Sequence, residues 1–154
     1  MKENETSKAQ LSKLTHVGLV VRDLEKAIEH LSSLGMGPFE QSHAAIPTKE
    51  KLFRDKPANY SVKASTGKMG DLTLEVIQPV QGESPHTEFL DSKGEGIAHL
   101  GFEVDDLDGE VSRMVKNGAS ILMSAKYADY EGGFVYLQLD ALGDITLELS
   151  QPWR

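Results

Sequence analysis

Two glutamates and two histidines stand at matching places in two halves of the chain. Glu75 lies in the segment GDLTLEVIQP and Glu148 lies in GDITLELSQP, and these segments share seven of ten residues. His16 opens HVGLVVRDL and His99 opens HLGFEVDDL, with Gly, Val, Asp and Leu at the same distances after each histidine. Imidazole and carboxylate groups bind divalent ions such as Zn, Ni, Co, Fe or Mn without any thiolate. The four residues are therefore a candidate metal site.

The repeat decides between two interpretations of these residues. A lone polar residue on a strand usually faces solvent, because an antiparallel sheet commonly has one wet face. Two similar halves related by a pseudo-twofold axis instead bring equivalent positions together. One His and one Glu from each half then form a cluster of four ligands, which leaves two octahedral positions open. Gly18 and Gly101, two residues after each histidine, leave room beside it.

Each half predicts the same order of elements. Alternating apolar residues in LTHVGLVV and IAHLGFEV indicate a strand around each histidine. Asp23 and the pair Asp105–Asp106 are typical helix N-caps, and Gly35 and Gly118 are typical helix ends. Three further strands follow in each half, so each half is expected to be a βαβββ module. These strands are PFEQSHAA, NYSVKAST and LTLEVIQ in the first half, and ASILMSAK, GFVYLQLD and ITLELS in the second.

The same repeat sets the expected domain limits. We expect a polar tail over residues 1–13 and a single domain over 14–152. Within the domain, the modules cover 14–79 and 96–152. A linker over 80–95 joins them and contains a short helix at HTEFLDS.

Composition limits the classes of partner. The chain has 154 residues, enough for one buried core, and it has no cysteine, which excludes thiolate chemistry. A net charge of −8 argues against binding to nucleic acid or to anionic membranes. The polar N-terminus lacks the apolar core of a secretion signal, so we expect a cytoplasmic protein with a small-molecule substrate. An anionic substrate would need a local basic patch, and KEKLFRDK (Lys49 to Lys56) is the one cluster of that kind.

These motifs resemble the vicinal oxygen chelate superfamily, which includes glyoxalase I, methylmalonyl-CoA epimerase, extradiol dioxygenases and bleomycin-resistance proteins. The resemblance covers roughly Leu14 to Pro152. It implies an α+β fold in which two tandem βαβββ modules form a cupped, mostly antiparallel sheet with helices outside. It also implies one divalent metal ion in the cup, with ligands on the first and last strands of each module. By motif these ligands are His16 (THVGL), Glu75 (LEVIQP), His99 (GIAHLGFEVDD) and Glu148 (LELSQP).

Within the superfamily, the stretch LEVIQPVQGESPHTEFLDSKGEGIAHLGFEVDDL is similar to methylmalonyl-CoA epimerases and their glyoxalase-like relatives. Two features depart from the epimerase pattern. Epimerases often have a second histidine where this chain has Ala98, and they carry an acid on a strand that here reads NYSVKAST, where Lys63 is the nearest polar candidate. The segment HAAIPTKEKLFRDKPA, which precedes that strand, resembles an insertion.

The resemblance implies a reaction in which the metal ion stabilises an enolate while a carboxylate moves a proton. Glu148 is the first choice for this base and Glu75 is the second. Lys63, Tyr136 and Gln138 are candidates to line the pocket, although ordinary sheet-face positions explain them equally well. For His43 and His86, which lie near strand ends or loops, a structural role is favoured over a place in the pocket.

Three functions fit these residues. The first is a metal-dependent isomerase or lyase acting on a small carbonyl compound, including a CoA or glutathione thioester. The second is a non-catalytic protein that sequesters a small molecule, as the resistance proteins do, although those generally lack the four ligands. The third is an Fe(II) extradiol dioxygenase, which uses two His and one Glu, so that the fourth ligand Glu75 argues against it. Because dimers are common in this superfamily, we expect a homodimer, and the modules can pair within or between chains.

Overall fold

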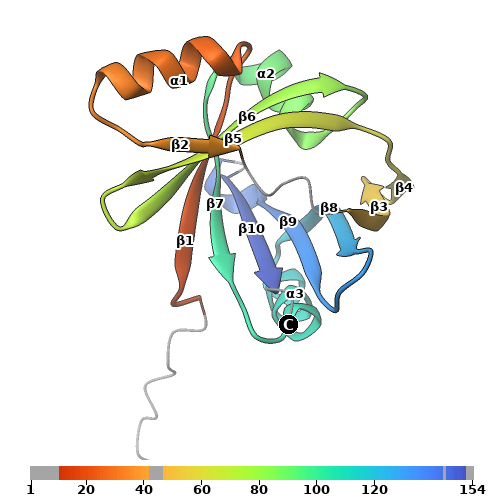
Figure 1. Cartoon of the computed structure of the whole chain (residues 1–154). Helices are drawn as coiled ribbons and strands as arrows, with labels where there is room; N and C mark the ends of the chain where they lie inside the picture. The colour runs from red at the N-terminus through yellow and green to blue at the C-terminus, as the bar shows by residue number, and fades with distance from the viewer. Residues whose placement is uncertain (1–10, 42–46, 144, 152–154) are drawn as a thin grey trace, which may run out of the picture.

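The computed structural model of the chain describes residues 11–41, 47–143 and 145–151 (Figure 1). His43 and most of the expected N-terminal tail lie outside these residues. Across the described ranges, no helix combines the length and the apolar character needed to cross a membrane.

The described residues form one mixed, open sheet with the strand order β2-β5-β6-β1-β7-β10-β9-β8-β3-β4. Parallel pairing joins β1 to β6 and β7 to β10, and the other neighbouring strands are antiparallel. The expected α+β fold with two βαβββ modules in a mostly antiparallel sheet is confirmed. The strands are β1 (Leu14–Val20), β2 (Phe39–Gln41), β3 (Thr48–Phe53), β4 (Lys56–Pro57), β5 (Ser61–Met69), β6 (Leu72–Gln81), β7 (Gly96–Glu103), β8 (Ser120–Tyr127), β9 (Gly133–Leu139) and β10 (Ile145–Gln151).

The first and last strands of both modules lie side by side at the centre of the sheet. Their order is β6-β1-β7-β10, and β1 and β7 form the antiparallel seam between the modules. Each of these strands carries one of the four candidate ligands: His16 on β1, Glu75 on β6, His99 on β7 and Glu148 on β10. The topology therefore brings the four residues to neighbouring strands.

Helices α1 (Leu24–Ser33) and α3 (Leu107–Lys116) cover the sheet face that points away from these four residues. Alternation along each strand puts Leu74 and Val76 under α1, and Leu147 and Leu149 under α3, where they form two apolar clusters with the helices. A short 3-10 turn, η2 (Asp140–Leu142), precedes β10. The opposite, concave face is left for the site.

The repeated glutamine of the two decapeptides has a structural role at the helix starts. The side-chain oxygen of Gln78 accepts a hydrogen bond from the Leu24 amide at 2.9 Å, and that of Gln151 accepts one from the Leu107 amide at 3.1 Å. Asp23 and Asp106 also cap these two helices through their side chains. Each last strand is therefore tied to the helix of its own module, because orphan amides at a helix start need acceptors.

The linker forms helix α2 (Pro85–Lys93), which contains the short helix expected at HTEFLDS and is capped by Ser84. Unlike α1 and α3, this helix contributes to the walls of the concave face, through the buried side chain of His86.

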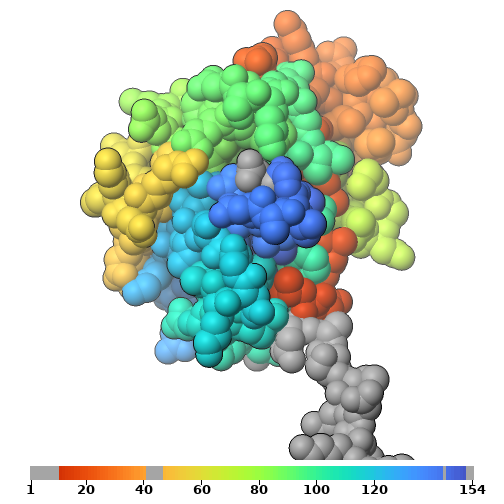
Figure 2. All heavy atoms as spheres, turned by 180° about the vertical axis from the view of Figure 1, so that it is seen from behind, coloured from red at the N-terminus to blue at the C-terminus, as the bar shows by residue number. Residues whose placement is uncertain are grey.

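The inserted segment forms a hairpin, β3–β4, that the sequence does not predict. Although it belongs to the first module in sequence, β3 pairs with β8, the outer strand of the second module. Arg54, which lies in the turn between β3 and β4, donates two hydrogen bonds to Glu88 of α2, at 3.1 and 2.7 Å. In Figure 2 the hairpin region (yellow) lies beside α2 (green). The hairpin and α2 together therefore form one rim of the concave face.

Candidate metal centre

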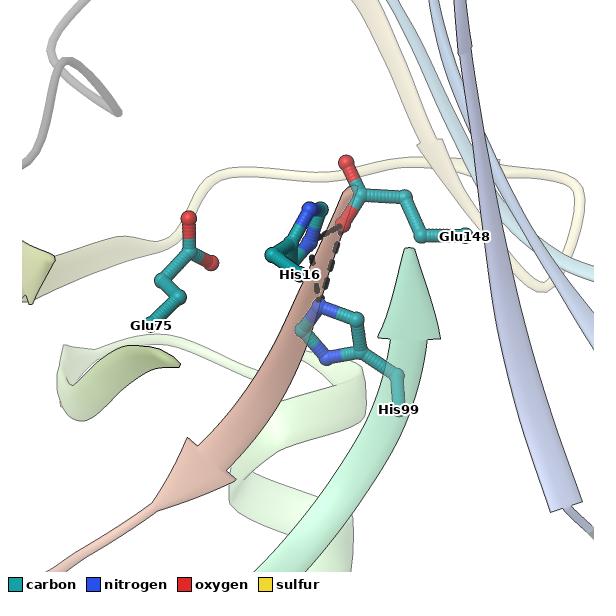
Figure 3. A group of neighbouring side chains, drawn as sticks. All are labelled: His16, Glu75, His99 and Glu148. Atoms are coloured by element: carbon teal, nitrogen blue, oxygen red, sulfur yellow. Dashed lines mark hydrogen bonds and ion pairs between the residues drawn. The ribbon is translucent and has the colours of Figure 1, made fainter. Parts of the chain in front are cut away.

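The four predicted ligands converge on the concave face of the sheet, as Figure 3 shows. The Nε2 atoms of His16 and His99 are 3.0 Å apart, and each lies 3.0 Å from Oε2 of Glu148. One ligand atom from each of the four residues, Glu75 included, lies within 4.8 Å of the others. Three donor atoms thus form a tight triangle, and the Glu75 carboxylate lies farther out on the other side of the histidines.

This triangle fits a divalent ion. For metal–ligand bonds of about 2.1 Å, neighbouring donors are about 3.0 Å apart on an octahedron and about 3.4 Å apart on a tetrahedron. The observed separations of 3.0 Å match one face of an octahedron. His16, His99 and Glu148, with Glu75 as the looser fourth residue, are therefore the side chains that would hold the ion.

Thr15 fixes which nitrogen of His16 faces the centre. Its hydroxyl donates its single hydrogen to the Gly101 carbonyl at 3.1 Å, and it also lies 3.1 Å from Nδ1 of His16. The hydroxyl can therefore only accept from His16, so Nδ1 carries a proton and Nε2 is the nitrogen that faces the other three residues and is left to bind an ion. This is the protonation state that a metal-binding histidine needs.

The two glycines of the HVG and HLG motifs make room for the imidazole rings. His16 pairs with Gly101 and His99 pairs with Gly18 across the β1–β7 seam. A Cβ atom at Gly101 would lie 2.0 Å from Cε1 of His16, and one at Gly18 would lie 2.0 Å from Cε1 of His99. Each glycine therefore serves the histidine of the opposite module, not the histidine of its own motif.

The two carboxylates have opposite electrostatic environments. Burial opposes the charge on Glu148, but hydrogen bonds and positive charge from His16 and His99 hold its pKa well below the usual range. Burial, followed by the negative charge of Glu148, raises the pKa of Glu75. For His16, burial favours the neutral ring, yet the hydrogen bond and charge of Glu148 and the charge of Glu75 raise its pKa. Glu148 is thus the firmly ionised member and Glu75 the one closest to taking up a proton.

Tyr136 positions Glu148 and His99. It is paired with Glu148 in the register of β9 and β10, and its ring centroid lies 5.0 Å from that of His99. Burial and the charges of Glu148 and Glu75 raise the pKa of Tyr136 well above its usual value. The phenol therefore stays protonated and acts as a hydrogen-bond donor.

A cavity of about 570 Å³ opens above the four residues, a volume suited to a small ligand. His16, Glu75 and Glu148 form part of its lining, and an aromatic wall makes up much of the rest. That wall includes Tyr60, His86, Tyr127, Phe134 and Tyr136, and Lys51 lies among them.

The three predicted pocket residues lie in different places. Tyr136 lines the cavity. Gln138 instead lines a second cavity of about 350 Å³, beneath α2. Lys63 is not among the lining residues of the main cavity, and its Nζ lies 3.9 Å from Oε1 of Glu25 on α1. Because β5 alternates, its neighbours Val62 and Ala64 line the cavity while Lys63 points to the helix side.

Two basic residues of the cavity lining, His86 and Lys51, were not assigned to the pocket from the sequence. The linker helix brings in His86, which is 5% exposed and has a pKa lowered to about 4 by burial and the nearby charge of His99. The inserted hairpin brings in Lys51. The basic cluster in KEKLFRDK was the available signal for Lys51, but nothing in the sequence placed that cluster beside the metal centre.

A cupped sheet of two βαβββ modules with a His₂Glu₂ quartet on its concave face defines a recognisable class of protein. The family model for the Glyoxalase/Bleomycin resistance protein/Dioxygenase superfamily matches residues 15–136, and the chain belongs to this superfamily.

Among known proteins, the chain is similar to methylmalonyl-CoA epimerases. The mitochondrial methylmalonyl-CoA epimerase of Mus musculus is 27% identical over 144 residues, which are 92% of this chain and 74% of the mouse protein. The crystal structure of the Mycobacterium tuberculosis methylmalonyl-CoA epimerase has a TM-score of 0.66 at 21% identity and covers 98% of this chain and 95% of that chain. A variant of the Streptomyces coelicolor epimerase in complex with 2-nitronate-propionyl-CoA has a TM-score of 0.62 at 17% identity, and the match covers 92% of this chain and 97% of that chain.

Proposed function

We propose that this protein is a divalent-metal-dependent, epimerase-like enzyme that moves a proton next to the carbonyl of a small substrate, in the first place an acyl-CoA thioester. The observation that carries the proposal is the pair of carboxylates, Glu75 and Glu148, on opposite sides of two histidines in the lining of a cavity. The similarity to proteins named methylmalonyl-CoA epimerase supports the thioester as substrate class.

The four side chains of the quartet would hold the metal ion. When bound there, the ion supplies Lewis-acid chemistry, which stabilises negative charge that develops on the carbonyl oxygen. The aromatic wall and the buried position of the centre keep water away from the reacting carbon.

The two carboxylates, Glu75 and Glu148, carry out the proton transfer. Glu75 makes no hydrogen bond to the other three members, and its raised pKa makes it the better proton acceptor. It takes the proton from the carbon next to the carbonyl, and the C–H electron pair moves toward the carbonyl oxygen. Inversion requires a proton to return to the opposite face of that carbon, and Glu148, an ionised carboxylate on the other side of the histidines, relays this proton from solvent water. The sequence alone favours Glu148 as first base, but Glu148 is held by both imidazoles.

The test is exchange of solvent deuterium into the α-carbon of methylmalonyl-CoA by protein reconstituted with each of Zn, Ni, Co, Fe and Mn. We expect exchange with at least one ion, and a loss of at least about 100-fold in Glu75→Gln and in Glu148→Gln, because each removes an acid–base group. Glu103→Gln is the matched control, since Glu103 is also a strand glutamate, on β7, but pairs with Lys13 at the surface.

If no ion supports exchange into methylmalonyl-CoA or into a panel of other acyl-CoA thioesters and hemithioacetals, the enzymatic proposal fails. The protein would then be a small-molecule binding member of the superfamily. Product analysis of the panel separates an epimerase, which inverts one carbon, from a lyase, which breaks a bond.

A further inference from the structure

His86 enters the main cavity from the first turn of α2. Ser84 and Pro85 fix the start of this helix, because the Ser84 side chain accepts a hydrogen bond from the Thr87 amide at 3.1 Å and Pro85 is the first helical residue. His86 is 5% exposed, and it lines the same cavity as the metal centre. An anchored helix therefore holds a buried polar ring in the cavity wall.

The His86 ring packs nearly perpendicular to two tyrosine rings. Its centroid lies 6.4 Å from that of Tyr60, with 72° between the ring planes. It lies 5.7 Å from the centroid of Tyr136, with 84° between the planes. Aromatic rings in such an arrangement attract each other. The packing therefore sets the orientation of the imidazole before any ligand enters the cavity.

Neither ring nitrogen of His86 has a hydrogen-bond partner among the described residues. Most buried polar side-chain atoms in proteins have one, because an unmet hydrogen bond at a buried group is costly. The nitrogens are not sealed off, since within the described ranges the only buried side-chain nitrogen or oxygen that lacks both a partner and solvent access is Nδ1 of His99. The His86 nitrogens are therefore open, and the cavity that this residue lines is where a partner can reach them.

Packing alone does not explain an imidazole at this position. The neighbouring side chains are aromatic, and a phenylalanine ring would pack there without giving up hydrogen bonds to water. Burial and the charge of His99 lower the pKa of His86 to about 4, so the ring is uncharged near neutral pH. An uncharged imidazole has one N–H donor and one acceptor nitrogen. His86 thus presents an unused, neutral hydrogen-bonding group to the cavity.

The ring of Tyr136 links His86 to the metal centre. Its centroid lies 5.0 Å from that of His99 and 5.7 Å from that of His86. The cavity of about 570 Å³ is lined both by His86 and by members of the metal centre, and it is large enough for one small ligand to contact both. A molecule that binds the centre through its carbonyl group can therefore contact His86 with a second group.

We propose that His86 is a substrate-binding residue of the main cavity, and that it donates a hydrogen bond to an uncharged oxygen that the substrate carries in addition to its reacting carbonyl group. This inference rests on the proposed function, because it assigns the reacting carbonyl to the metal centre. A hydroxyl group on the acyl chain is the simplest oxygen of this kind. It suits His86 better than a carboxylate does, since a carboxylate buried against a neutral ring would gain no counter-charge from that ring.

The test compares butyryl-CoA with 2-, 3- and 4-hydroxybutyryl-CoA, which add one hydroxyl group at successive carbons. Isothermal titration calorimetry on the zinc-loaded protein measures binding without requiring turnover. We expect at least one hydroxy thioester to bind about 5- to 50-fold more tightly than butyryl-CoA, because the analogue without a hydroxyl leaves the imidazole unpaired. His86→Phe should lose this preference and bind butyryl-CoA at least as tightly as the wild type. His86→Gln keeps an N–H donor and should retain part of the preference.

His30→Phe is the matched control, because it makes the same change at an exposed histidine of α1 and should keep the wild-type preference. NMR of zinc-loaded protein labelled with ¹⁵N-histidine gives a second measurement. The nitrogen signals of His86, identified by their loss in His86→Phe, should shift further with the preferred hydroxy thioester than with butyryl-CoA.

Equal binding of all four thioesters by the wild type, no binding of any, or a hydroxyl preference that persists in His86→Phe would overturn the inference. A preference for methylmalonyl-CoA over propionyl-CoA that depends on His86, without one for any hydroxyl, would also overturn it, because the partner of His86 would then be a carboxylate. Deuterium exchange without a hydroxyl preference would overturn the inference and leave the proposed reaction standing. A hydroxyl preference that depends on His86 in a protein without exchange would refute only the proposed reaction.

Discussion

Gly101 lies directly across the β1–β7 seam from His16, and the side chain it lacks leaves the space that the His16 imidazole occupies. The relation is reciprocal, because Gly18 stands in the same way opposite His99. Two short motifs that look like local repeats in the sequence are therefore interlocked in space. The glycine of each motif is needed because a larger residue there would occupy the space of the histidine of the other module.

Replacement of this glycine should damage metal binding more than folding. In Gly101→Ala the new methyl group would lie 2.0 Å from Cε1 of His16, so the ring must move out of the donor triangle. We expect metal affinity to fall by about 10- to 100-fold, the loss typical when a ligand loses its orientation. Competition with a chromogenic chelator measures this change. Gly70→Ala is the control: its φ of 63° strains alanine, yet its Cβ contacts nothing, so stability should fall while metal affinity stays.

Metal loading should stabilise the folded chain. We expect one divalent ion per chain by inductively coupled plasma mass spectrometry. At a free ion concentration of about 100 times Kd, we expect a rise in Tm of about 5 to 10 °C, since the ion binds only the folded state. EDTA should reverse the rise. A double variant with His16→Gln and His99→Gln should show neither the ion nor the rise, and full loading of that variant would remove the basis for the metal centre.

Two similar substitutions should change stability in opposite directions in the metal-free protein. The folded state raises the pKa of Glu75 above its unfolded value, so its charge costs stability above about pH 4.5, and Glu75→Gln should raise Tm at pH 7.5. The folded state lowers the pKa of Glu148, so its charge adds stability above that pH. Glu148→Gln should therefore lower stability, by about 2 kcal/mol for the charged hydrogen bonds it loses. Thermal unfolding in EDTA measures the change in Tm of each variant relative to the wild type. Changes in Tm of the same sign in both variants would contradict the prediction.

His86 should make the protein sensitive to acid. Its folded pKa of about 4 lies below the ordinary histidine value of 6.5, so the unfolded chain binds more protons between these values. The stability contribution is complete above pH 6.5 and falls as the pH drops toward 4, by about 3 kcal/mol in total. Urea unfolding at several pH values should show a steeper loss in the wild type than in His86→Phe. His30→Gln, a change at an exposed histidine of α1, should keep the wild-type slope.

The sequence was sufficient to predict the fold class and the grouping of the four candidate ligands. The reason is the duplication: equivalent strands of two packed modules must meet, so His16 and His99, or Glu75 and Glu148, could be placed near each other without knowledge of the packing. Alternation within each strand then put all four on one face. The homodimer and the cytoplasmic location stay predictions.

The inserted hairpin escaped sequence analysis for physical reasons. Its strand β3 reads TKEKLF, which lacks the apolar alternation of a half-buried strand, and its partner β8 lies about 70 residues later in the chain. The position of Lys51 depends further on a one-residue register shift, and such a shift reverses the facing of every residue beyond it. The sequence shows the basic cluster, but it does not show on which face of the sheet the side chains of that cluster lie.

The seam between β1 and β7 also divides the quartet evenly. Residues before Pro79 supply one imidazole and one carboxylate, and residues after Gly96 supply the other two. A fragment that ends near Pro79 would keep half of the donors and would leave the β1 edge without its partner. Two separately produced fragments would have to reassemble along this edge to share a single ion. The affinity between the two fragments would therefore rise when the ion is present, and the size of that rise would measure how strongly the ion binds.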